Sequence, residues 1–424
     1  MQRPLVVQKF GGSSVADADR IRRVARRIAR ERAAGSDLVV IVSAMGDTTD
    51  ELLSLAAAIT DEPDPRELDM LLATGEHQSA TLMSMALHSL GVAAISLTGP
   101  QAGITTDGRY GRARIANVEP IRIRGEIDRG NVVIIAGFQG QSAAAIGQSE
   151  ITTLGRGGSD TTAVALAAAL GADRCQIFTD VRGIYTADPR VVPAARQLPV
   201  IGYEEMLELA HQGAQVMQVR AVELGWVNDV VIEVLSSFED APGTLIREDP
   251  LVEQRNKVRG LAHDRNVAKV TIVAVPDRPG VARALFDPLA EAGINVDMIV
   301  QNVGHGGATD LSFTVPRVEL AKAKKVLEPV VRELGARELT TDASVAKVSI
   351  VGAGLHNAPG YAARMFGTLA DAGVNIEMIS TSEVRITCMI AEAELPQALN
   401  ALHGAFELAT PDPIDAAATG QTAG

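Results

Sequence analysis

The chain has 424 residues, more than one hydrophobic core usually fills, so two or three domains are expected. Its formal net charge of −13 argues against nucleic acid or an anionic membrane as the main partner. The two cysteines, Cys175 and Cys388, lie far apart in apolar surroundings, which indicates reduced core residues and not a disulfide or a metal site. Met1 opens almost directly into a predicted strand, and no apolar run is long enough to span a bilayer, so a cytoplasmic protein without a signal peptide is expected.

Strand and helix patterns alternate along the first half of the chain. Strands are predicted at 5–10, 38–43, 93–97, 132–136, 176–179 and 230–235, and helices at 17–34, 50–60, 67–90 and 163–170. Strands that alternate with helices form a mostly parallel sheet covered on both faces. In such sheets ligands bind beyond the carboxyl ends of the strands, so a site is expected in the loops that follow them.

The second half of the chain contains an internal repeat. A Pro-Gly turn near residue 240 and a polar stretch at 247–257 indicate a domain boundary before it. Residues 268–273 then match 346–351, the Pro-Gly pair at 279–280 matches 359–360, and 289–299 match 369–379. Each copy predicts a βαββαβ module. We therefore expect an α/β catalytic domain over 1–245, two modules over 262–340 and 341–410, and a disordered tail over 411–424.

Lys9 lies at the end of the first predicted strand, just before the Gly11-Gly12 pair. A buried lysine is costly without an anion beside it, so a phosphate contact explains its position; the alternative is a lysine that reaches from the strand end into water. The sequence has no G-x-x-x-x-G-K-[ST] motif, and no G-x-G-x-x-G motif follows this strand. P-loop ATPases, Rossmann dehydrogenases and protein kinases are therefore disfavoured.

A second glycine loop, at 155–158, precedes the apolar helix predicted at 163–170. Free N–H groups in such a loop and the dipole of the helix together form an anion-binding arrangement. Ser159 or Asp160 is expected to cap the helix, and Arg156 adds a planar fork that suits a carboxylate or a phosphate. The alternative is a capped surface turn with an unrelated arginine.

Three further stretches of the sequence are candidates for parts of a functional site. Residues 43–50 follow the second strand and form either a capped turn or part of a site. Gly75 and Glu76 interrupt the helical pattern at 67–90, and a glycine there predicts the close approach of another segment, although an isolated Glu is usually solvated. Residues 178–190 form a long polar loop after a strand, with an aromatic that could face a purine.

Six motifs in this order closely resemble those of the aspartate kinase (aspartokinase) family: KFGGSS at 9–14, VSAM at 42–45, TGE at 74–76, GFQG at 137–140, GRGGSD at 155–160 and TADPR at 186–190. The resemblance extends to about residue 408, and the repeat resembles the paired ACT regulatory domains of that family. It implies an amino-acid-kinase fold followed by two ferredoxin-like ACT domains. It also implies transfer of the γ-phosphoryl group of ATP, with Mg²⁺, to the side-chain carboxylate of L-aspartate, which opens the route to lysine, threonine and methionine.

The resemblance also implies roles for individual residues. Lys9 would contact the transferring phosphoryl group, and Asp160 would either orient Lys9 or cap the helix; no Mg²⁺ ligands are indicated. ATP would be bound by Lys9, Phe10, Gly11, Gly12, Ser43, Thr179, Asp180, Tyr185, Thr186, Ala187, Asp188, Pro189 and Arg190. Aspartate would be bound by Asp47, Thr48, Thr49, Glu76, Arg156, Gly157, Gly158 and Ser159, with Glu76 on its ammonium group and Arg156 on its α-carboxylate.

An effector site is implied in the repeats, for lysine, threonine or both. Its residues would be Asp277, Gly280, Ala282, Ile294, Asn295, Asp297, Gln301, Asn375 and Ile376. The expected assembly is a homo-oligomer, or an α2β2 assembly with a shorter C-terminal subunit, held through the ACT domains. His77 stands where relatives usually carry Arg, and the loop at 304–307 is shorter than in many relatives, which bears on acceptor contacts and on effector identity.

Two other readings stay open from the sequence. Another kinase of the same fold, for glutamate, acetylglutamate or UMP, would share the glycine loops, but Glu76 with Arg156 favours an acceptor with a free amine and a carboxylate. A purely regulatory amino-acid-binding protein would be expected to have lost the N-terminal motifs, which are intact here.

Overall fold

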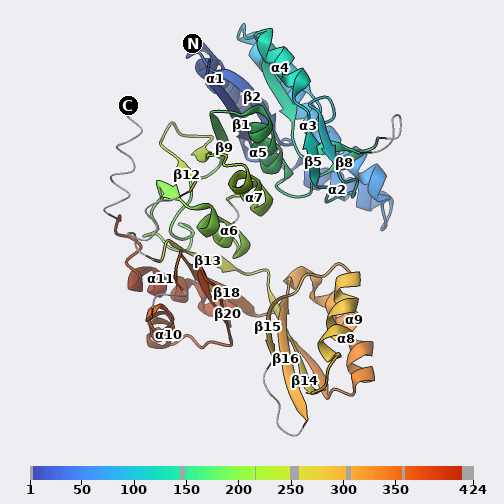
Figure 1. Cartoon of the computed structure of the whole chain (residues 1–424), viewed down its shortest axis with the longest axis vertical. Helices are drawn as coiled ribbons and strands as arrows, with labels where there is room; N and C mark the ends of the chain where they lie inside the picture. Colours follow the sequence, from blue (N-terminus) through green and yellow to red (C-terminus); the bar gives the residue numbers. More distant parts are fainter. Residues whose placement is uncertain are drawn as a thin grey trace.

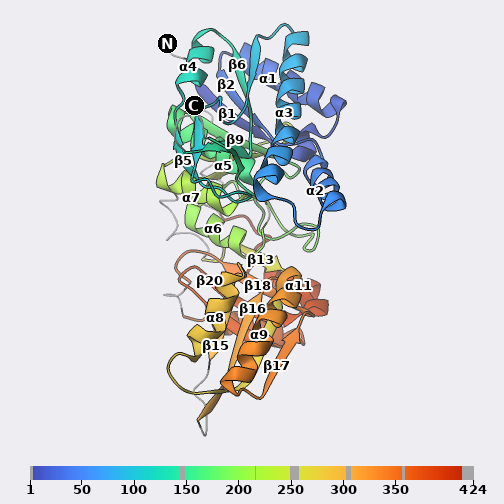
Figure 2. The same cartoon turned by 90° about the vertical axis from the view of Figure 1, so that its right-hand side faces the viewer.

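The computed structural model describes residues 3–143, 149–214, 216–248, 257–301, 307–355 and 359–412 (Figure 1). The predicted tail from residue 413 onward and residues 304–306 of the short glycine loop lie outside these ranges. Figure 2 shows a large N-terminal domain at one end of the molecule and two smaller sheets at the other. Within the described ranges, no helix combines the length and the apolar character needed to cross a membrane.

A mostly parallel sheet of eight strands forms the centre of the N-terminal domain, as predicted. Its strand order is β10-β12-β11-β9-β1-β2-β6-β3, and β12 pairs antiparallel with β11 at one side. The strands are β1 (Leu5–Phe10), β2 (Asp37–Val42), β3 (Ala94–Leu97), β6 (Val132–Ala136), β9 (Arg174–Thr179), β10 (Val200–Ile201), β11 (Ile232–Ser236) and β12 (Thr244–Ile246). Strands β9, β1, β2 and β6 are parallel neighbours, so their carboxyl ends lie together at one edge.

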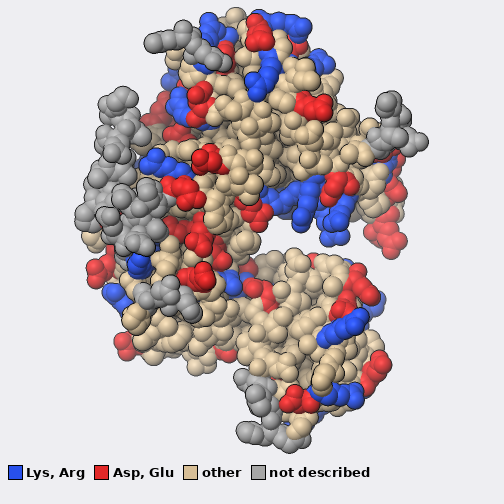
Figure 3. Space-filling model, in the orientation of Figure 1, with Lys and Arg blue, Asp and Glu red and all other residues tan. Residues whose placement is uncertain are grey.

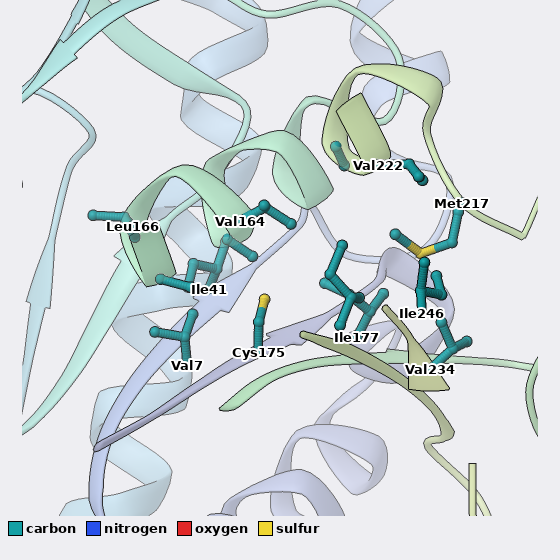
Figure 4. Close-up of a cluster of buried hydrophobic side chains, with 14 of the residues drawn as sticks. Val7, Ile41, Val164, Leu166, Cys175, Ile177, Met217, Val222, Val234 and Ile246 are labelled. Atoms are coloured by element: carbon teal, nitrogen blue, oxygen red, sulfur yellow. The ribbon is translucent and has the colours of Figure 1, made fainter. Parts of the chain in front are cut away.

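Helices cover both faces of this sheet because alternate strand residues point to opposite sides. Val6 and Val40 share a core with α1 (Ala18–Ala33) and α3 (Pro65–Ser89) on one face. Val7 and Ile41 belong to the core of the other face, and Figure 4 shows them near α5. The helices on that face are α4 (Ile121–Asp128), α5 (Gly158–Leu170), α6 (Tyr203–His211) and α7 (Val219–Val227). Cys175 lies in the same core, and both cysteines are buried and unpaired, as predicted.

Two further elements of this domain border the loops expected to carry the site. Helix α2 (Thr48–Ile59) follows β2 and has no buried residue. A second, four-stranded sheet has the order β5-β4-β7-β8. Its strands are β4 (Ile104–Thr106), β5 (Ile115–Val118), β7 (Gln139–Ser142) and β8 (Ile151–Thr153). Because β8 ends at Thr153, this sheet holds the chain immediately before the 155–158 glycine loop.

The first repeat forms the predicted βαββαβ module. Its elements are β14 (Ala268–Pro276), α8 (Val281–Glu291), β15 (Asp297–Gln301), β16 (Ala308–Val315), α9 (Leu320–Leu334) and β17 (Glu338–Asp342). The sheet order is β15-β16-β14-β17, which is the ferredoxin-like arrangement. Leu285 and Leu289 of α8 and Leu327 of α9 pack on one face of the sheet, which explains why both helices carry an apolar stripe.

The second repeat departs from the prediction that each copy completes its own module. It supplies β18 (Val345–Val351), α10 (Tyr361–Asp371), β19 (Met378–Thr381), β20 (Arg385–Ala391) and α11 (Leu395–Ala405). The fourth strand of its sheet is β13 (Gly260–Asp264), which precedes the first repeat in the chain and pairs antiparallel with β18. The chain therefore contributes β13 to the second module, then forms the whole first module, and then forms the rest of the second. By pairing with β18, β13 covers an edge of that strand that would otherwise be free.

The two repeats contact each other through reciprocal ion pairs. Lys347 of the second repeat pairs with Asp297 of the first at 2.9 Å, and Lys269 of the first pairs with Glu377 of the second at 3.0 Å. The lysines occupy matching positions of the repeat, and so do the two acidic residues. The internal repeat in the sequence is therefore also a repeat of the contacts between the two modules.

The second module also packs against the N-terminal domain, in part through α6. Glu205 of α6 accepts a hydrogen bond from the backbone N–H of Ala353 at 3.1 Å, and Ser349 donates to Gln212 at 3.2 Å. Arg385 lies 3.5 Å from Glu208, so three polar contacts join the same helix and its C-terminal turn to one sheet. The first module makes no comparable set of contacts with α6 among the residues described.

Candidate active site

The candidate active site lies where the carboxyl ends of β1, β2, β6 and β9 meet the N-terminus of α5. Lys9 and Phe10 end β1, Ser43 follows β2, and Gly137 follows β6. Gly137 lies directly against the helix: a Cβ atom on it would come within 2.9 Å of the Cβ of Ser159. The sheet topology thus brings together four of the six motifs singled out in the sequence.

Lys9 is held by Asp160. The ammonium nitrogen of Lys9 lies 2.6 Å from a carboxylate oxygen of Asp160, and both side chains are almost buried, with 12% and 10% of their surface exposed. Of the two roles considered for Asp160, orienting Lys9 is the one observed. The predicted cap is wrong, because α5 begins at Gly158 with Gly157 at the N-cap position and no side-chain cap bond. Ser159 and Asp160 therefore lie inside the first turn.

The first glycine loop packs tightly against its neighbours. A Cβ atom at Gly12 would lie 2.9 Å from the carbonyl oxygen of Ala44, and the Gly12 carbonyl accepts a hydrogen bond from Gly46 at 3.1 Å. At Gly11, a Cβ would lie 3.3 Å from the ammonium nitrogen of Lys9. A larger residue at position 12 would clash with the backbone of the loop after β2, whereas at position 11 it would meet the movable end of the Lys9 side chain. Both glycines stay partly exposed beside the lysine.

Glu76 is buried beside the loop that follows β2. One carboxylate oxygen accepts a hydrogen bond from the backbone N–H of Ala44 at 3.1 Å, and the other has no partner among the described residues. Burial raises the pKa of Glu76 to about 7. Helix α3 runs through Gly75 without interruption, contrary to the prediction, but the predicted close approach is confirmed: a Cβ there would lie 2.9 Å from the Ala44 methyl group and 3.5 Å from that of Thr48.

Arg156 lies on the surface, flanked by two glycines. Gly155 and Gly157 both have positive φ angles, 79° and 71°, which other residues adopt with difficulty. The side chain of Arg156 is 88% exposed, and its guanidinium group pairs at 3.0 Å with Asp50 of α2. Asp47, Thr48 and Thr49, predicted to bind the acceptor, lie at the start of α2, where Asp47 takes the N-cap position without making a side-chain cap bond.

The predicted nucleotide segment divides into buried and exposed parts. Thr186 and Ala187 are buried against the second module, and the Thr186 hydroxyl bonds to His403 at 3.0 Å. Tyr185 is partly exposed, and Arg190 pairs with Asp188 at 2.8 Å. Partial burial alone would raise the pKa of Asp188, but its hydrogen bonds with Arg190 hold it below the usual range.

The remaining nucleotide candidates lie at the ends of β1 and β9. Phe10 stacks on Phe178 in the core, with ring centres 4.6 Å apart, so neither ring faces a ligand. The Thr179 hydroxyl donates to Asp180 at 3.1 Å. Pro189 follows Asp188 in an irregular segment at the surface. Ser43 donates its backbone N–H to Phe10 at 3.1 Å.

Asp69, in the site region, was not singled out from the sequence, and the contact that His77 makes was not predicted. Asp69 of α3 is buried and accepts hydrogen bonds from the backbone of Gly111 and from both the backbone and the hydroxyl of Thr153, which fixes the second sheet against α3. His77 bonds to Gln139 of the 137–140 motif at 2.6 Å. A carboxylate within an amphipathic helix gives no local signal of such partners, because they are 42 and 84 residues away in the chain.

Most of the predicted effector residues lie in the first module, at either end of α8 and in β15. Asp277 and Gly280 lie in the turn before α8, Ala282 is exposed on its first turn, and Ile294 and Asn295 follow its end. A pocket of about 540 Å³ is lined by Arg112, Phe286, Ala290, Gly293, Ile294, Asn295, Val296 and Ile299. Arg112 belongs to the N-terminal domain, and Figure 3 shows basic side chains gathered where that domain faces the first module.

Asp297, the predicted partner of an effector ammonium group, is engaged by Lys347 of the other repeat. Burial alone would raise the pKa of Asp297, but the hydrogen bond and the charge of Lys347 hold it below the usual range. Gln301 ends β15, Asn375 is exposed before β19, and Ile376 packs partly against the core of the second module. The structure thus places candidates from both repeats along facing edges of the two modules.

Comparisons with known proteins agree with this arrangement. A model of the amino acid kinase family matches residues 4–230, and ACT domain models match residues 269–333 and 348–406. Aspartokinase of Mycolicibacterium smegmatis is 51% identical over 413 residues, covering 96% of this chain and 97% of the relative. Aspartate kinase of Pseudomonas putida is 51% identical over 409 residues, covering 96% and 98%.

Solved structures give the same result. E. coli aspartokinase III in complex with aspartate and ADP matches with a TM-score of 0.79 at 28% identity, covering 95% of this chain and 99% of that one. The same enzyme with lysine and aspartate matches with a TM-score of 0.74, covering 94% and 99%. The order of the motifs, the sheet topology, the two repeats and these likenesses together show that the chain belongs to the aspartokinase family, with an amino acid kinase domain followed by two ACT domains.

Proposed function

We propose that this chain transfers the γ-phosphoryl group of ATP to the side-chain carboxylate of L-aspartate, giving 4-phospho-L-aspartate and ADP. The observation that carries the proposal is the buried Lys9–Asp160 pair beside two glycine loops, at the common edge of four parallel strands. A lysine held in this way presents a fixed positive charge where an anion can approach. The pathway to lysine, threonine and methionine begins with this product.

The reaction needs charge stabilisation more than proton transfer. A side-chain carboxylate with an ordinary pKa near 3.9 is ionised at pH 7, so no general base is required. One of its oxygens attacks the γ-phosphorus while the bond to the bridging oxygen of ADP breaks, and negative charge spreads over the transferring group. Lys9 would meet this charge directly, and the backbone of Gly11 and Gly12 would lie beside it. Asp160 would keep the ammonium group of Lys9 in place.

Recognition of the amino acid would rest on Glu76 and Arg156. The unpartnered oxygen of Glu76 is a buried acceptor that an ammonium group could satisfy, and this suits an acceptor with a free amine. Arg156 would bind the α-carboxylate by exchanging its exposed pairing with Asp50 for the substrate. Thr48 lies within van der Waals distance of the Gly75 position and would border the same space.

ATP would lie along the ends of β1 and β9, near Asp180, Tyr185 and Arg190. Mg²⁺, when bound, neutralises phosphate charge. No group of three His, Cys, Asp or Glu side chains in the described ranges forms a ready metal site. We further propose a cytoplasmic location, where both substrates are available.

The direct test is ATP consumption by the purified full-length chain with a panel of acceptors: aspartate, glutamate, acetylglutamate and UMP. We expect activity with aspartate and formation of an acyl phosphate that hydroxylamine traps. Activity with another acceptor in preference to aspartate, or with none, would contradict the proposed reaction. Omission of Mg²⁺ is expected to abolish turnover.

The raised pKa of Glu76 predicts a pH-dependent affinity for aspartate. An ammonium group binds the ionised carboxylate, and with a pKa of about 7 roughly nine-tenths of Glu76 is ionised at pH 8 but about one-tenth at pH 6. The KM for aspartate is therefore expected to rise about tenfold as the pH falls from 8 to 6, while the KM for ATP changes little. In Glu76→Gln the KM should be high and independent of pH over this range; a wild-type KM that stays flat would remove Glu76 from the ammonium site.

We also propose inhibition by lysine, threonine or both through the ACT domains. The structural support is the set of candidate residues from both repeats and the contact of the second module with α6. An effector inhibits only if it binds an inactive arrangement more tightly than the active one, by about 1–3 kcal/mol in typical cases. A homo-oligomer or an α2β2 assembly is proposed with it, and the exposed Ile299 and Ile379 on edge strands β15 and β19 support contacts through the modules.

Asp297→Ala is expected to abolish this inhibition, because it removes the proposed partner of the effector ammonium group. The measurement is activity at millimolar lysine and threonine, singly and together, with the activity in their absence measured alongside. Glu377→Ala is the matched control, since it breaks the equivalent ion pair with Lys269. Equal loss of inhibition in both variants would assign Asp297 to holding the modules together, and a wild type indifferent to both amino acids would contradict regulation by them.

A further inference from the structure

The residues of the loop that carries Arg156 do not by themselves fix its backbone conformation. Gly155 and Gly157 flank the arginine with φ angles of 79° and 71°, and glycine adopts many other conformations as readily. The side chain of Arg156 is exposed, and the contact that it makes among the described residues is a surface ion pair with Asp50, which contributes little to stability. The direction in which Arg156 points must therefore depend on what holds the backbone on each side of it.

Helix α7 supplies two of these contacts. Arg220 donates one hydrogen bond to the carbonyl of Leu154 and another to the carbonyl of Ala113, each at 2.8 Å. Gln218, at the N-cap position of the same helix, donates to the carbonyl of Arg156. The backbone is thus held before Gly155 and again at Arg156. Arg220 also links Leu154 to Ala113, which lies just before β5 of the second sheet.

Gln218 also restricts the next residue of the loop. A Cβ atom at Gly157 would lie 2.9 Å from both the Cβ and the Cγ of Gln218, so the glutamine packs directly against the glycine backbone. Helices α5 and α7 share one core, to which Ala163 and Val164 contribute from α5 and Ala221 and Val222 from α7. The two polar side chains therefore extend from a helix that is itself firmly seated beside the loop.

We propose that Gln218 and Arg220 are positioning residues for the acceptor: they hold the 154–157 backbone so that Arg156 meets the carboxylate of the amino acid. This rests on the proposed function, because it takes Arg156 as the carboxylate contact. Neither residue needs to touch the substrate. Replacing either residue leaves the side chain of Arg156 unchanged but lets its loop sample other conformations. A misplacement of a binding group by about 1 Å can lower the reaction rate by as much as a hundredfold.

Kinetics of full-length variants test this. In Gln218→Ala and Arg220→Gln, the KM for aspartate is expected to rise about tenfold, with the KM for ATP within about twofold and kcat within about threefold of wild type. Arg220→Lys should lie between wild type and Arg220→Gln, because an ammonium group can keep a bond to one carbonyl but lacks the fork that reaches two.

Arg124 of α4 offers a matched control, because it contacts the other end of α5, the helix that follows the loop. Arg124 donates to the carbonyls of Ala169 and Leu170 at 3.3 and 3.2 Å, at the opposite end of α5 from the loop. Arg124→Gln removes the same kind of contact and is expected to lower Tm without changing the KM for aspartate. If the α7 variants raise that KM no more than Arg124→Gln does, they are merely structural and the proposal is wrong. If Arg220→Gln does not fold, Gln218→Ala gives the same test, because Gln218 is half-exposed.

Two further outcomes separate this proposal from the one it rests on. A wild type without aspartate kinase activity contradicts both. If the wild type is active but the α7 variants raise the KM for ATP as much as the KM for aspartate, the proposed reaction stands. The loop then serves the nucleotide, and the positioning role for the acceptor is wrong.

Discussion

Replacing Lys9 by alanine is expected to lower kcat by about a hundredfold or more while the KM for aspartate changes little. The ammonium group of Lys9 is fixed by Asp160 at 2.6 Å and lies beside the Gly11 backbone, where a transferring phosphoryl group would gain charge. A contact that matters mainly in the transition state affects kcat and leaves ground-state binding of the acceptor almost unchanged. Steady-state kinetics at saturating ATP measure both constants.

The same substitution leaves Asp160 nearly buried without a partner, which can destabilise a protein by about 3–5 kcal/mol. The Tm of each variant must therefore be measured, and Lys9→Met combined with Asp160→Asn keeps the site neutral. Gln8→Ala is a matched control, because it removes a buried hydrogen bond to Gln176 at 2.9 Å from the adjacent position of β1. A Lys9→Ala enzyme within a few-fold of wild-type kcat would show that Lys9 does not stabilise the transition state.

The central fold could be predicted because its elements have strong local signals. The apolar run at 5–10 is a strand buried on both faces, and β1 has those bounds in the structure. Helix α1 begins after Asp17, whose carboxylate accepts a hydrogen bond from the backbone of Arg20, as its position before an amphipathic run indicates. The repeat in the second half likewise predicted the first module, since its apolar positions recur at matching places.

Elements that depend on distant partners could not be predicted in this way. Strands β4 and β8 have three residues each, too few to show a period, and they form because they pair with other short strands, β4 with β5 and β7 and β8 with β7. Strand β13 completes a sheet whose next strand, β18, comes after an entire intervening module. The start of α5 was misplaced because Asp160, a good capping residue, is used to hold Lys9.

The candidate site likewise contains residues with a local sequence signal and residues without one. The structure has Lys9 near the end of β1 beside the first glycine loop, as a lysine before glycines at a strand end indicates. The role of Lys9 in phosphoryl transfer stays a prediction. Thr186 gave no local sign that its hydroxyl bonds to His403, which is 217 residues away. Gln218 and Arg220 were also missed, since on α7 they resemble ordinary surface residues until the helix is packed against the 155–158 loop.

Arg156→Ala is expected to raise the KM for aspartate by about a hundredfold and to leave the KM for ATP nearly unchanged. Two hydrogen bonds from a guanidinium fork to a carboxylate are together worth about 3 kcal/mol, which corresponds to a factor of about one hundred in affinity. Only the amino acid presents a carboxylate to this fork. Arg156→Lys, which keeps the charge but not the paired geometry, should give an intermediate KM.

The ion pair with Asp50 provides the control for this prediction. Both partners are largely exposed, at 88% and 59% of their side-chain surface, so the pair contributes at most about 1 kcal/mol and is readily displaced. Asp50→Asn removes a competitor for the guanidinium group without removing the group itself, so the KM for aspartate should stay the same or fall slightly. If Asp50→Asn raises the KM as much as Arg156→Ala, the ion pair itself shapes the site; if Arg156→Ala raises both KM values equally, the arginine serves the nucleotide and the acceptor carboxylate is bound elsewhere.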